Sequence, residues 1–254
     1  MRASVAALVA RKIGSLQIGS WLATRPAKVA WEGGVVSFTF DDFPKSALTN
    51  GGSILANHGL RGTYYTALKL AGTQGNLGRM FDDEDVLAAH AAGHEIACHT
   101  YTHLDCCQAD AASVVEEVRE NGAKLSALLC GAQMTNFAYP YGAVSISAKR
   151  AVANRFASSR GTGQGINCGT VDLADLLGTR IYDCAFDRAA LRALIDRTRA
   201  IGGWLIFYTH DVSDTPSEFG CKPDQLEEIV AYAAERSEVL PVRDVAARLG
   251  FGHA

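Results

Sequence analysis

The sequence lacks the features that mark several large classes of protein. No apolar run reaches the roughly 20 residues that a transmembrane helix needs. No run of Lys and Arg is longer than Arg11-Lys12, and the formal net charge is −3, so neither a membrane span nor a nucleic-acid partner is expected. A Gly-x-Ser-x-Gly elbow is absent, and the glycine-rich stretch 161–165 lacks the Lys-Ser/Thr ending of a phosphate loop.

The cysteines do not suggest a disulfide framework. They are seven in number, contain no Cys-x-x-Cys pair and lie mostly inside apolar segments. We therefore expect reduced, buried thiols. A zinc-thiolate site at Cys106 and Cys107 is the alternative, but two adjacent residues chelate one ion poorly.

Reduced thiols favour a cytoplasmic location. The apolar residues 4–10 faintly resemble the core of a secretory signal, but the stretch is short and Arg11-Lys12 interrupts it. We expect a cytoplasmic protein, with export as the alternative.

The chain alternates short β-rich runs with longer helical patterns, which is typical of parallel βα units. With 254 residues, of which 48% are hydrophobic and 20% charged, it fits one large α/β domain. We expect an N-terminal extension at 1–26 and a single domain at 27–254. Strands are predicted at 35–40, 62–67, 94–98, 136–139, 155–158, 179–182, 204–208 and 239–241. Helices are predicted at 46–58, 83–91, 109–129, 145–153, 188–200, 224–236 and 242–249.

The predicted strands are nearly continuous in apolar residues, as expected for a sheet buried on both faces. Gly59, Gly93 and Gly202 stand where helices should end and the next strand begin. A distorted (β/α) barrel of seven or eight strands fits this pattern best. An open doubly wound sheet is the alternative.

Polar residues follow four of the predicted strands. Asp41 and Asp42 follow the first, His99 the third, the turn Tyr139-Pro140-Tyr141-Gly142 the fourth, and His210 the seventh. In a βα barrel these strand ends meet at one face, where function gathers. Two histidines four apart, His99 and His103, reach one ion from a single helical turn, and a carboxylate from another strand completes an open metal site.

Each of these residues also has a structural interpretation. The Asp41-Asp42 pair would suit a helix cap, although one acid suffices and two adjacent acids repel each other without a cation. His210 would suit a core position with its hydrogen bonds satisfied. His94-Glu95 does not form a zincin motif, because the next histidine stands five residues along.

Read as an ordered set, the motifs resemble those of the NodB-type polysaccharide deacetylases, carbohydrate esterase family 4. They read Thr39-Phe40-Asp41-Asp42, His99-Thr100-Tyr101-Thr102-His103, Phe137-Ala138-Tyr139-Pro140-Tyr141-Gly142 and Leu205-Ile206-Phe207-Tyr208-Thr209-His210-Asp211. Each motif alone is weak, but the order and separations match from about residue 35 to residue 211. The Ala-Tyr-Pro-Tyr-Gly variant resembles the branch of exopolysaccharide and poly-N-acetylglucosamine deacetylases.

The resemblance implies a divalent metal, usually zinc, with cobalt, nickel or manganese as alternatives, held by Asp42, His99 and His103. It implies that Asp41 is the general base for the attacking water, that the backbone N–H of Tyr141 helps hold the oxyanion, and that His210 protonates the leaving amine. The implied substrate is an N-acetylated sugar or polysaccharide. The alternatives are hydrolysis of a non-sugar amide or an O-acetyl ester, and a catalytically silent sugar-binding barrel.

The sequence departs from the family pattern at three places. Phe43-Pro44 replaces the glycine that usually follows the aspartate pair, which changes the loop over the metal. Ala138 replaces the arginine that often holds the base aspartate; we expect Arg180 to take over, with Arg160 as the second candidate. The aspartate that tunes the acid histidine has no clear match, and Asp183 and Asp172 are weak options.

Overall fold

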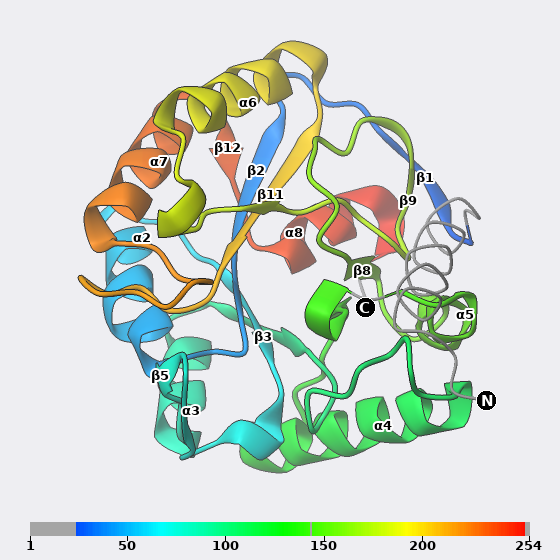
Figure 1. Cartoon of the computed structure of the whole chain (residues 1–254). Helices are drawn as coiled ribbons and strands as arrows, with labels where there is room; N and C mark the ends of the chain where they lie inside the picture. The colour runs from blue at the N-terminus through cyan, green and yellow to red at the C-terminus, as the bar shows by residue number, and fades with distance from the viewer. Residues whose placement is uncertain (1–23, 143, 252–254) are drawn as a thin grey trace, which may run out of the picture.

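A curled parallel sheet forms the centre of the molecule and builds a half-barrel (Figure 1). The computed structural model describes residues 24–142 and 144–251. The strand order is β10-β11-β2-β3-β6-β7-β8, and β12 also pairs with β2. The bounds are β2 Val35–Asp41, β3 Thr63–Thr66, β6 Glu95–Cys98, β7 Asn136–Ala138, β8 Ser158–Arg160, β10 Thr179–Arg180, β11 Trp204–Thr209 and β12 Glu238–Val239. The predicted distorted barrel is confirmed.

One edge of the central strand β2 pairs with two different strands. Its first residues, Val35 and Val36, pair with β12, whereas Thr39 to Asp41 pair with β3. In the described residues β8 and β10 are not paired, and only an isolated bridge from Arg160 to Leu176 approaches the gap between them. The barrel is therefore distorted and incompletely closed.

Helices cover the outside of the sheet, and α6, α7 and α2 follow one another around β11, β2 and β12 (Figure 1). Asp82, Asp110, Ser145 and Asp187 cap the N-termini of α3, α4, α5 and α6, and each accepts the backbone N–H of the third residue of its helix. The bounds are α2 Ser53–Asn57, preceded by a π-helical turn η1 Ala47–Gly52, α3 Asp83–Ala91, α4 Ala111–Leu128, α5 Ile146–Ala153, α6 Arg188–Ile201, α7 Pro223–Arg236 and α8 Val242–Ala246, followed by η5 Ala247–Phe251.

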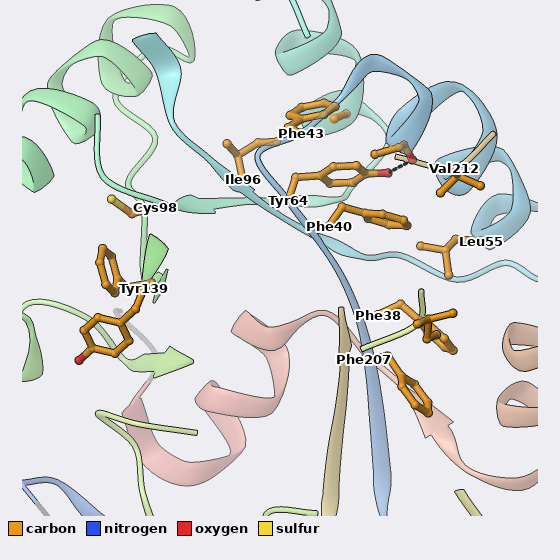
Figure 2. Packing of buried hydrophobic residues seen from close by; sticks show 14 of the residues in the cluster. Phe38, Phe40, Phe43, Leu55, Tyr64, Ile96, Cys98, Tyr139, Phe207 and Val212 are labelled. Carbon is orange, nitrogen blue, oxygen red and sulfur yellow. Dashed lines mark hydrogen bonds between the residues drawn. The ribbon is translucent and has the colours of Figure 1, made fainter. Parts of the chain in front are cut away.

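Aromatic side chains from β2 and its neighbours fill the space between the sheet and the outer helices. Phe38 stacks on Phe207 at 5.5 Å between ring centroids, and Phe40 stacks on Tyr64 at 4.9 Å (Figure 2). Every residue of β2 and of β11 is buried, as the apolar strand pattern predicts.

Several elements were missed or misplaced by the sequence pattern. The strand predicted at 155–158 lies at Ser158–Arg160, because α5 and its following turn extend to residue 156. The strands β1 Pro26–Val29 and β9 Gly169–Asp172 pair antiparallel beside the barrel, and the hairpin β4 Gln74–Gly75 with β5 Gly78–Arg79 projects after the short helix η2 Leu68–Leu70. Two to four residues are too few to show a periodic pattern. Most of the predicted extension, residues 1–23, lies outside the described residues.

The prediction of buried thiols is correct for only some of the cysteines. Cys98, Cys106 and Cys221 are buried free thiols, but Cys130 and Cys184 are exposed. Within the described residues, no helix combines the length and apolarity needed to cross a membrane.

A buried asparagine fastens α4 to the end of β3. Asn121 accepts a hydrogen bond from the Leu68 backbone N–H at 3.0 Å and donates one to the Thr66 carbonyl at 2.8 Å. Its side chain is fully buried, so no water could replace these partners after its removal.

Asn121→Leu should therefore lower the free energy of unfolding by about 2–6 kcal/mol, because it leaves a buried N–H and a buried C=O unsatisfied at about 1–3 kcal/mol each. Urea denaturation measures the change. Gly122→Ala on the next residue is the control: an added Cβ meets nothing within 4 Å, so stability should rise by about 0.5–1 kcal/mol. Equal stability of Asn121→Leu and wild type would contradict this assignment.

Candidate functional site

A cleft of about 840 Å³ opens at the carboxyl ends of the strands. Its lining includes six of the seven residues predicted to form the site: Asp41, Asp42, His99, His103, Tyr141 and His210. The seventh, Arg180, is not among the lining residues. The strand ends thus bring together side chains that are up to 169 positions apart in the sequence, as a parallel sheet does.

Asp42, His99 and His103 form a cluster that could hold a metal ion. Asp42 Oδ1 lies 3.6 Å from His99 Nε2 and 3.2 Å from His103 Nε2, and one ligand atom from each residue lies within 4.8 Å of the others. One carboxylate and two imidazoles with an open side suit zinc and related divalent ions.

The electrostatics of the cluster also fit a cation. Asp42 Oδ1 is buried and makes no hydrogen bond within the described residues. Burial raises the pKa of the Asp42 carboxyl to about 6, His210 opposes the rise and Asp41 adds to it. Burial likewise lowers the pKa of His99 to about 3, which keeps the imidazole neutral and its nitrogen lone pair available. A buried carboxylate without a proton donor, beside neutral imidazoles, is a site that a divalent cation would satisfy.

The orientation of His99 is set by β7. Its Nδ1 lies 2.8 Å from the carbonyl oxygen of Ala138, so Nδ1–H donates to that carbonyl and Nε2 faces Asp42. Such a bond from the second ring nitrogen fixes the tautomer of a metal-binding histidine.

The segment 99–103 is a loop, and the predicted helical turn is wrong. Thr100 and His103 have φ values of 60° and 61°, which right-handed helix excludes. The Glu117 carboxylate on α4 accepts the N–H groups of Tyr101 and Thr102 at 2.9 and 2.7 Å, and Thr100 Oγ1 accepts the N–H of Leu104 at 2.8 Å. These long-range and local bonds, rather than helix geometry, bring the two histidines to one point.

Left-handed backbone is concentrated around the cluster. Six non-glycine residues of the described chain have positive φ, and five of them, Asp42, Phe43, Thr100, His103 and Tyr141, belong to the site loops. Such conformations cost about 1–3 kcal/mol each and persist where the surroundings over-determine them. The loops are therefore held in place by their contacts and do not adopt their lowest-energy local conformation.

Arg160 pairs with Asp41, and the predicted pairing of Arg180 is wrong. The Arg160 guanidinium donates from Nη2 to Asp41 Oδ1, and both side chains are buried. Arg180 is exposed, with its guanidinium carbon 5.9 Å from the Tyr182 ring. The reason is register: Arg160 on β8 stands directly beside Ala138 on β7, the position where the family pattern has its arginine. The guanidinium thus reaches Asp41 from the neighbouring strand at the same level.

The pair keeps Asp41 ionised. Burial alone would raise the pKa of the Asp41 carboxyl, but the charges of Arg160, His99 and His210 outweigh it and hold the pKa below its usual value. Arg160 itself lies between two aromatic rings, with its guanidinium carbon 5.0 Å from the centre of Tyr65 and 4.7 Å from that of Tyr208. Its orientation is therefore fixed on both faces.

His210 stands across the cleft, directly after β11. Its Nδ1 lies 3.2 Å from the carbonyl oxygen of Phe219, and its ring lies 5.6 Å from the Phe219 ring and 5.9 Å from the Tyr182 ring. The Phe219 carbonyl takes the place expected for a tuning aspartate. Phe219 and Tyr182 line the cleft and were missed as site residues, because a single aromatic carries no motif.

Neither weak candidate for the tuning aspartate fills that role. Asp183 accepts from Gln225 at 2.8 Å and lies 3.4 Å from Lys222. Asp172 lies 2.7 Å from the Lys149 ammonium and accepts backbone N–H groups of the segment before β1. Both acids are engaged in holding elements together.

Tyr141 packs edge-on against His103. Its φ is 61°, its ring centre is 4.5 Å from that of His103, and 68% of the residue is exposed. An exposed aromatic at the mouth of a polar cleft offers a flat surface to a ligand.

Residues 28–157, just over half of the chain, match the family model described as polysaccharide deacetylase. The chain belongs to the polysaccharide deacetylase family. A chitin deacetylase of Arthroderma benhamiae is 26% identical to it over 121 residues, which are 47% of this chain and 31% of that protein. The chain thus spans about a third of the length of this curated relative.

Solved structures of other polysaccharide deacetylases and family 4 esterases share the fold. A Mycobacterium smegmatis protein assigned as a polysaccharide deacetylase superposes with a TM-score of 0.61 at 16% identity, covering 90% of this chain and 95% of that one. A family 4 acetyl xylan esterase from Clostridium thermocellum, in complex with a cobalt ion, gives 0.57 at 16% identity, covering 85% and 92%. A family 4 carbohydrate esterase from Streptomyces lividans, in complex with acetate, gives 0.54 at 20% identity, covering 82% and 91%.

The cluster predicts that the purified protein binds one equivalent of Zn²⁺. Asp42→Asn and His103→Ala should each weaken binding by more than about 100-fold, since loss of a ligand exceeds the 10–100-fold cost of losing an outer partner. Competition with a chromophoric chelator measures the affinity, and elemental analysis measures the stoichiometry. His90→Ala, an exposed histidine in the last turn of α3, is the control and should bind as wild type. Wild-type affinity in Asp42→Asn would exclude the site.

The two arginines differ in what their removal should cost. Arg160→Leu leaves the Asp41 carboxylate buried and unpaired, which should lower the free energy of unfolding by about 3–5 kcal/mol. Arg180→Leu removes an exposed side chain and should change it by less than about 0.5 kcal/mol. Urea denaturation at neutral pH compares the stabilities of the two variants. A larger loss of stability in Arg180→Leu than in Arg160→Leu would identify Arg180 as the partner of Asp41.

Proposed function

We propose that this protein is a metal-dependent hydrolase that removes N-acetyl groups from an N-acetylated sugar or polysaccharide. The observation that carries the proposal is the difference in surroundings between two adjacent acids. Asp42 faces two neutral histidines, whereas Asp41 is excluded from that cluster, paired with Arg160 and kept ionised. Two neighbouring carboxylates with opposite environments suit a ligand and a base.

When bound by Asp42, His99 and His103, a divalent metal, for which we propose zinc, supplies a Lewis acid that polarises the acetyl carbonyl and makes water acidic. Asp41 takes a proton from the attacking water, and its orientation is fixed by Arg160. The water oxygen bonds to the carbonyl carbon, and in this proposal the Tyr141 backbone N–H donates to the developing oxyanion.

Breakage of the carbon–nitrogen bond needs a proton on the leaving nitrogen. His210 lines the same cleft as the two acids, and its Nδ1–H donates to the Phe219 carbonyl, which leaves Nε2 as the atom that transfers the proton. Acetate and a free amino sugar are then the products. An imidazole suits this role because histidine is the side chain that most often acts as a general acid or base.

The proposed substrate class is an amino-sugar polymer. The Tyr139–Gly142 turn is the feature by which the chain resembles exopolysaccharide and poly-N-acetylglucosamine deacetylases, and the relative from Arthroderma benhamiae is a chitin deacetylase. The exposed Tyr141 and Phe219 at the cleft mouth offer apolar faces against which sugar rings pack.

Acetate release from N-acetylglucosamine oligomers by the zinc-loaded protein tests the proposal. Asp41→Asn should lose about 10²-fold or more in kcat with zinc retained, because it removes the base and not a ligand. His210→Ala should lose a similar factor on the amide but less on an O-acetyl ester, since an alcohol leaves more readily than an amine.

Arg180→Ala is the matched control and should keep kcat within about twofold, because Arg180 does not contact Asp41. Acetate release from esters alone would assign the protein to O-deacetylation. No release from any acetylated sugar would overturn the proposal. Equal losses of His210→Ala on amide and ester would remove His210 from the acid role.

A further inference from the structure

Two consecutive left-handed residues connect the metal-binding cluster to the next helix. Asp42 has a φ of 62° and Phe43 a φ of 59°. Glycine would adopt this conformation without strain, and the family pattern has glycine after the aspartate pair. Phe43 is nevertheless a bulky residue and fully buried. Its ring must therefore make contacts that offset the backbone strain.

Phe43 packs between the barrel and the segment that follows the hairpin. Its ring lies 4.6 Å from that of Tyr64 and stacks at 5.1 Å on that of Phe81, and Figure 2 shows it above Tyr64. The carbonyl oxygen of Phe43 also accepts the N–H of Phe81 at 3.2 Å. The ring and the backbone of Phe43 thus both contact Phe81.

The next two residues extend this contact. Pro44 forms an antiparallel bridge with Met80, and the Lys45 ammonium lies 3.1 Å from the Asp82 carboxylate and 2.7 Å from that of Asp85. Residues 43–45 therefore run against residues 80–85, and this contact strip forms the base of the β4–β5 hairpin.

The tip of the hairpin borders two hollows. Gly75, Asn76 and Leu77 line the cleft beside the metal-binding cluster and also a second hollow of about 600 Å³. Leu77 is buried in the same core cluster as Phe43, Met80 and Phe81, so the position of this wall depends on the packing in which Phe43 takes part.

The side of the hairpin that faces the cleft carries amide groups. Gln74 and Asn76 are exposed and line the cleft beside the metal-binding cluster. Neither side chain makes a hydrogen bond to the rest of the described chain. Tyr141, Tyr182 and Phe219 also line this cleft. An amide both donates and accepts, which matches sugar hydroxyl and acetamido groups, while aromatic rings match the apolar faces of the sugar.

We propose that the β4–β5 hairpin is a sugar-binding wall of the cleft, and that Phe43 is the positioning residue that holds this wall beside Asp42. The proposal rests on the proposed function for the nature of the ligand. Gln74 and Asn76 contact a sugar unit whose acetyl group lies at the metal cluster. Phe43 acts through Phe81 and does not touch the substrate.

Isothermal titration of pentamers of N-acetylglucosamine, β-1,4- and β-1,6-linked, into zinc-loaded Asp41→Asn protein tests the wall without turnover. Added to this parent, Gln74→Ala and Asn76→Ala should each weaken binding of at least one pentamer about fivefold, the loss expected for one hydrogen bond of about 1 kcal/mol. Arg79→Ala is the matched control, because Arg79 pairs with Gln74 in the hairpin but lines only the second hollow. It should bind as the parent does.

The positioning role is tested by a double-mutant cycle. Phe43→Leu and Phe81→Leu should each weaken pentamer binding while zinc affinity stays within about twofold of the parent, and in either background Gln74→Ala should have less than a twofold further effect. Phe156→Leu makes the same change at a ring that stacks on Phe137, away from the hairpin, and should leave pentamer binding unchanged.

Full additivity in the cycle would overturn the positioning role, and so would loss of zinc in both leucine variants. Unchanged binding in Gln74→Ala and Asn76→Ala, or no binding of either pentamer by the parent, would overturn the wall. Failure of the proposed function has a different signature, because wild-type protein would then bind a pentamer but release no acetate from it.

Discussion

The ion pair between Arg160 and Asp41 is the interaction on which the rest of the site depends. Both groups are buried in the barrel, and an unpaired charge there would be costly. Because the guanidinium is held between Tyr65 and Tyr208, it gives Asp41 one orientation and one protonation state. Asp41 can therefore stand next to Asp42 without both acids competing for the same cation.

The second constraint is the conformation of the loops. Five residues of the site loops adopt left-handed backbone without being glycine. Glu117 on α4 holds the histidine loop, and Phe81 holds the loop after Asp42. The site is thus stabilised by the body of the fold, which is how strained functional geometry persists.

Within the polysaccharide deacetylase family, this chain keeps the chemistry of the cluster and changes its surroundings. The guanidinium comes from β8, not from the position of Ala138 on β7, and the two positions are neighbours in register. A buried phenylalanine occupies the place of a glycine, and its ring stacks on Phe81 at the base of the hairpin whose residues line the cleft. In both cases a neighbouring part of the chain takes part: β8 supplies the guanidinium, and the segment after the hairpin supplies the ring on which Phe43 packs.

The sequence by itself determined the barrel, the strand order along the chain and the residues that meet at its open end. Continuous apolar strands and polar residues directly after them are local features, and parallel topology converts them into one cluster. Only the tertiary structure decided which arginine pairs with Asp41, since Arg160 and Arg180 both end short strands and differ in the register and position of those strands. The loop form of residues 99–103, the carbonyl behind His210 and the hairpin beside the cleft were likewise decided by contacts between segments far apart in the sequence, which no local pattern records.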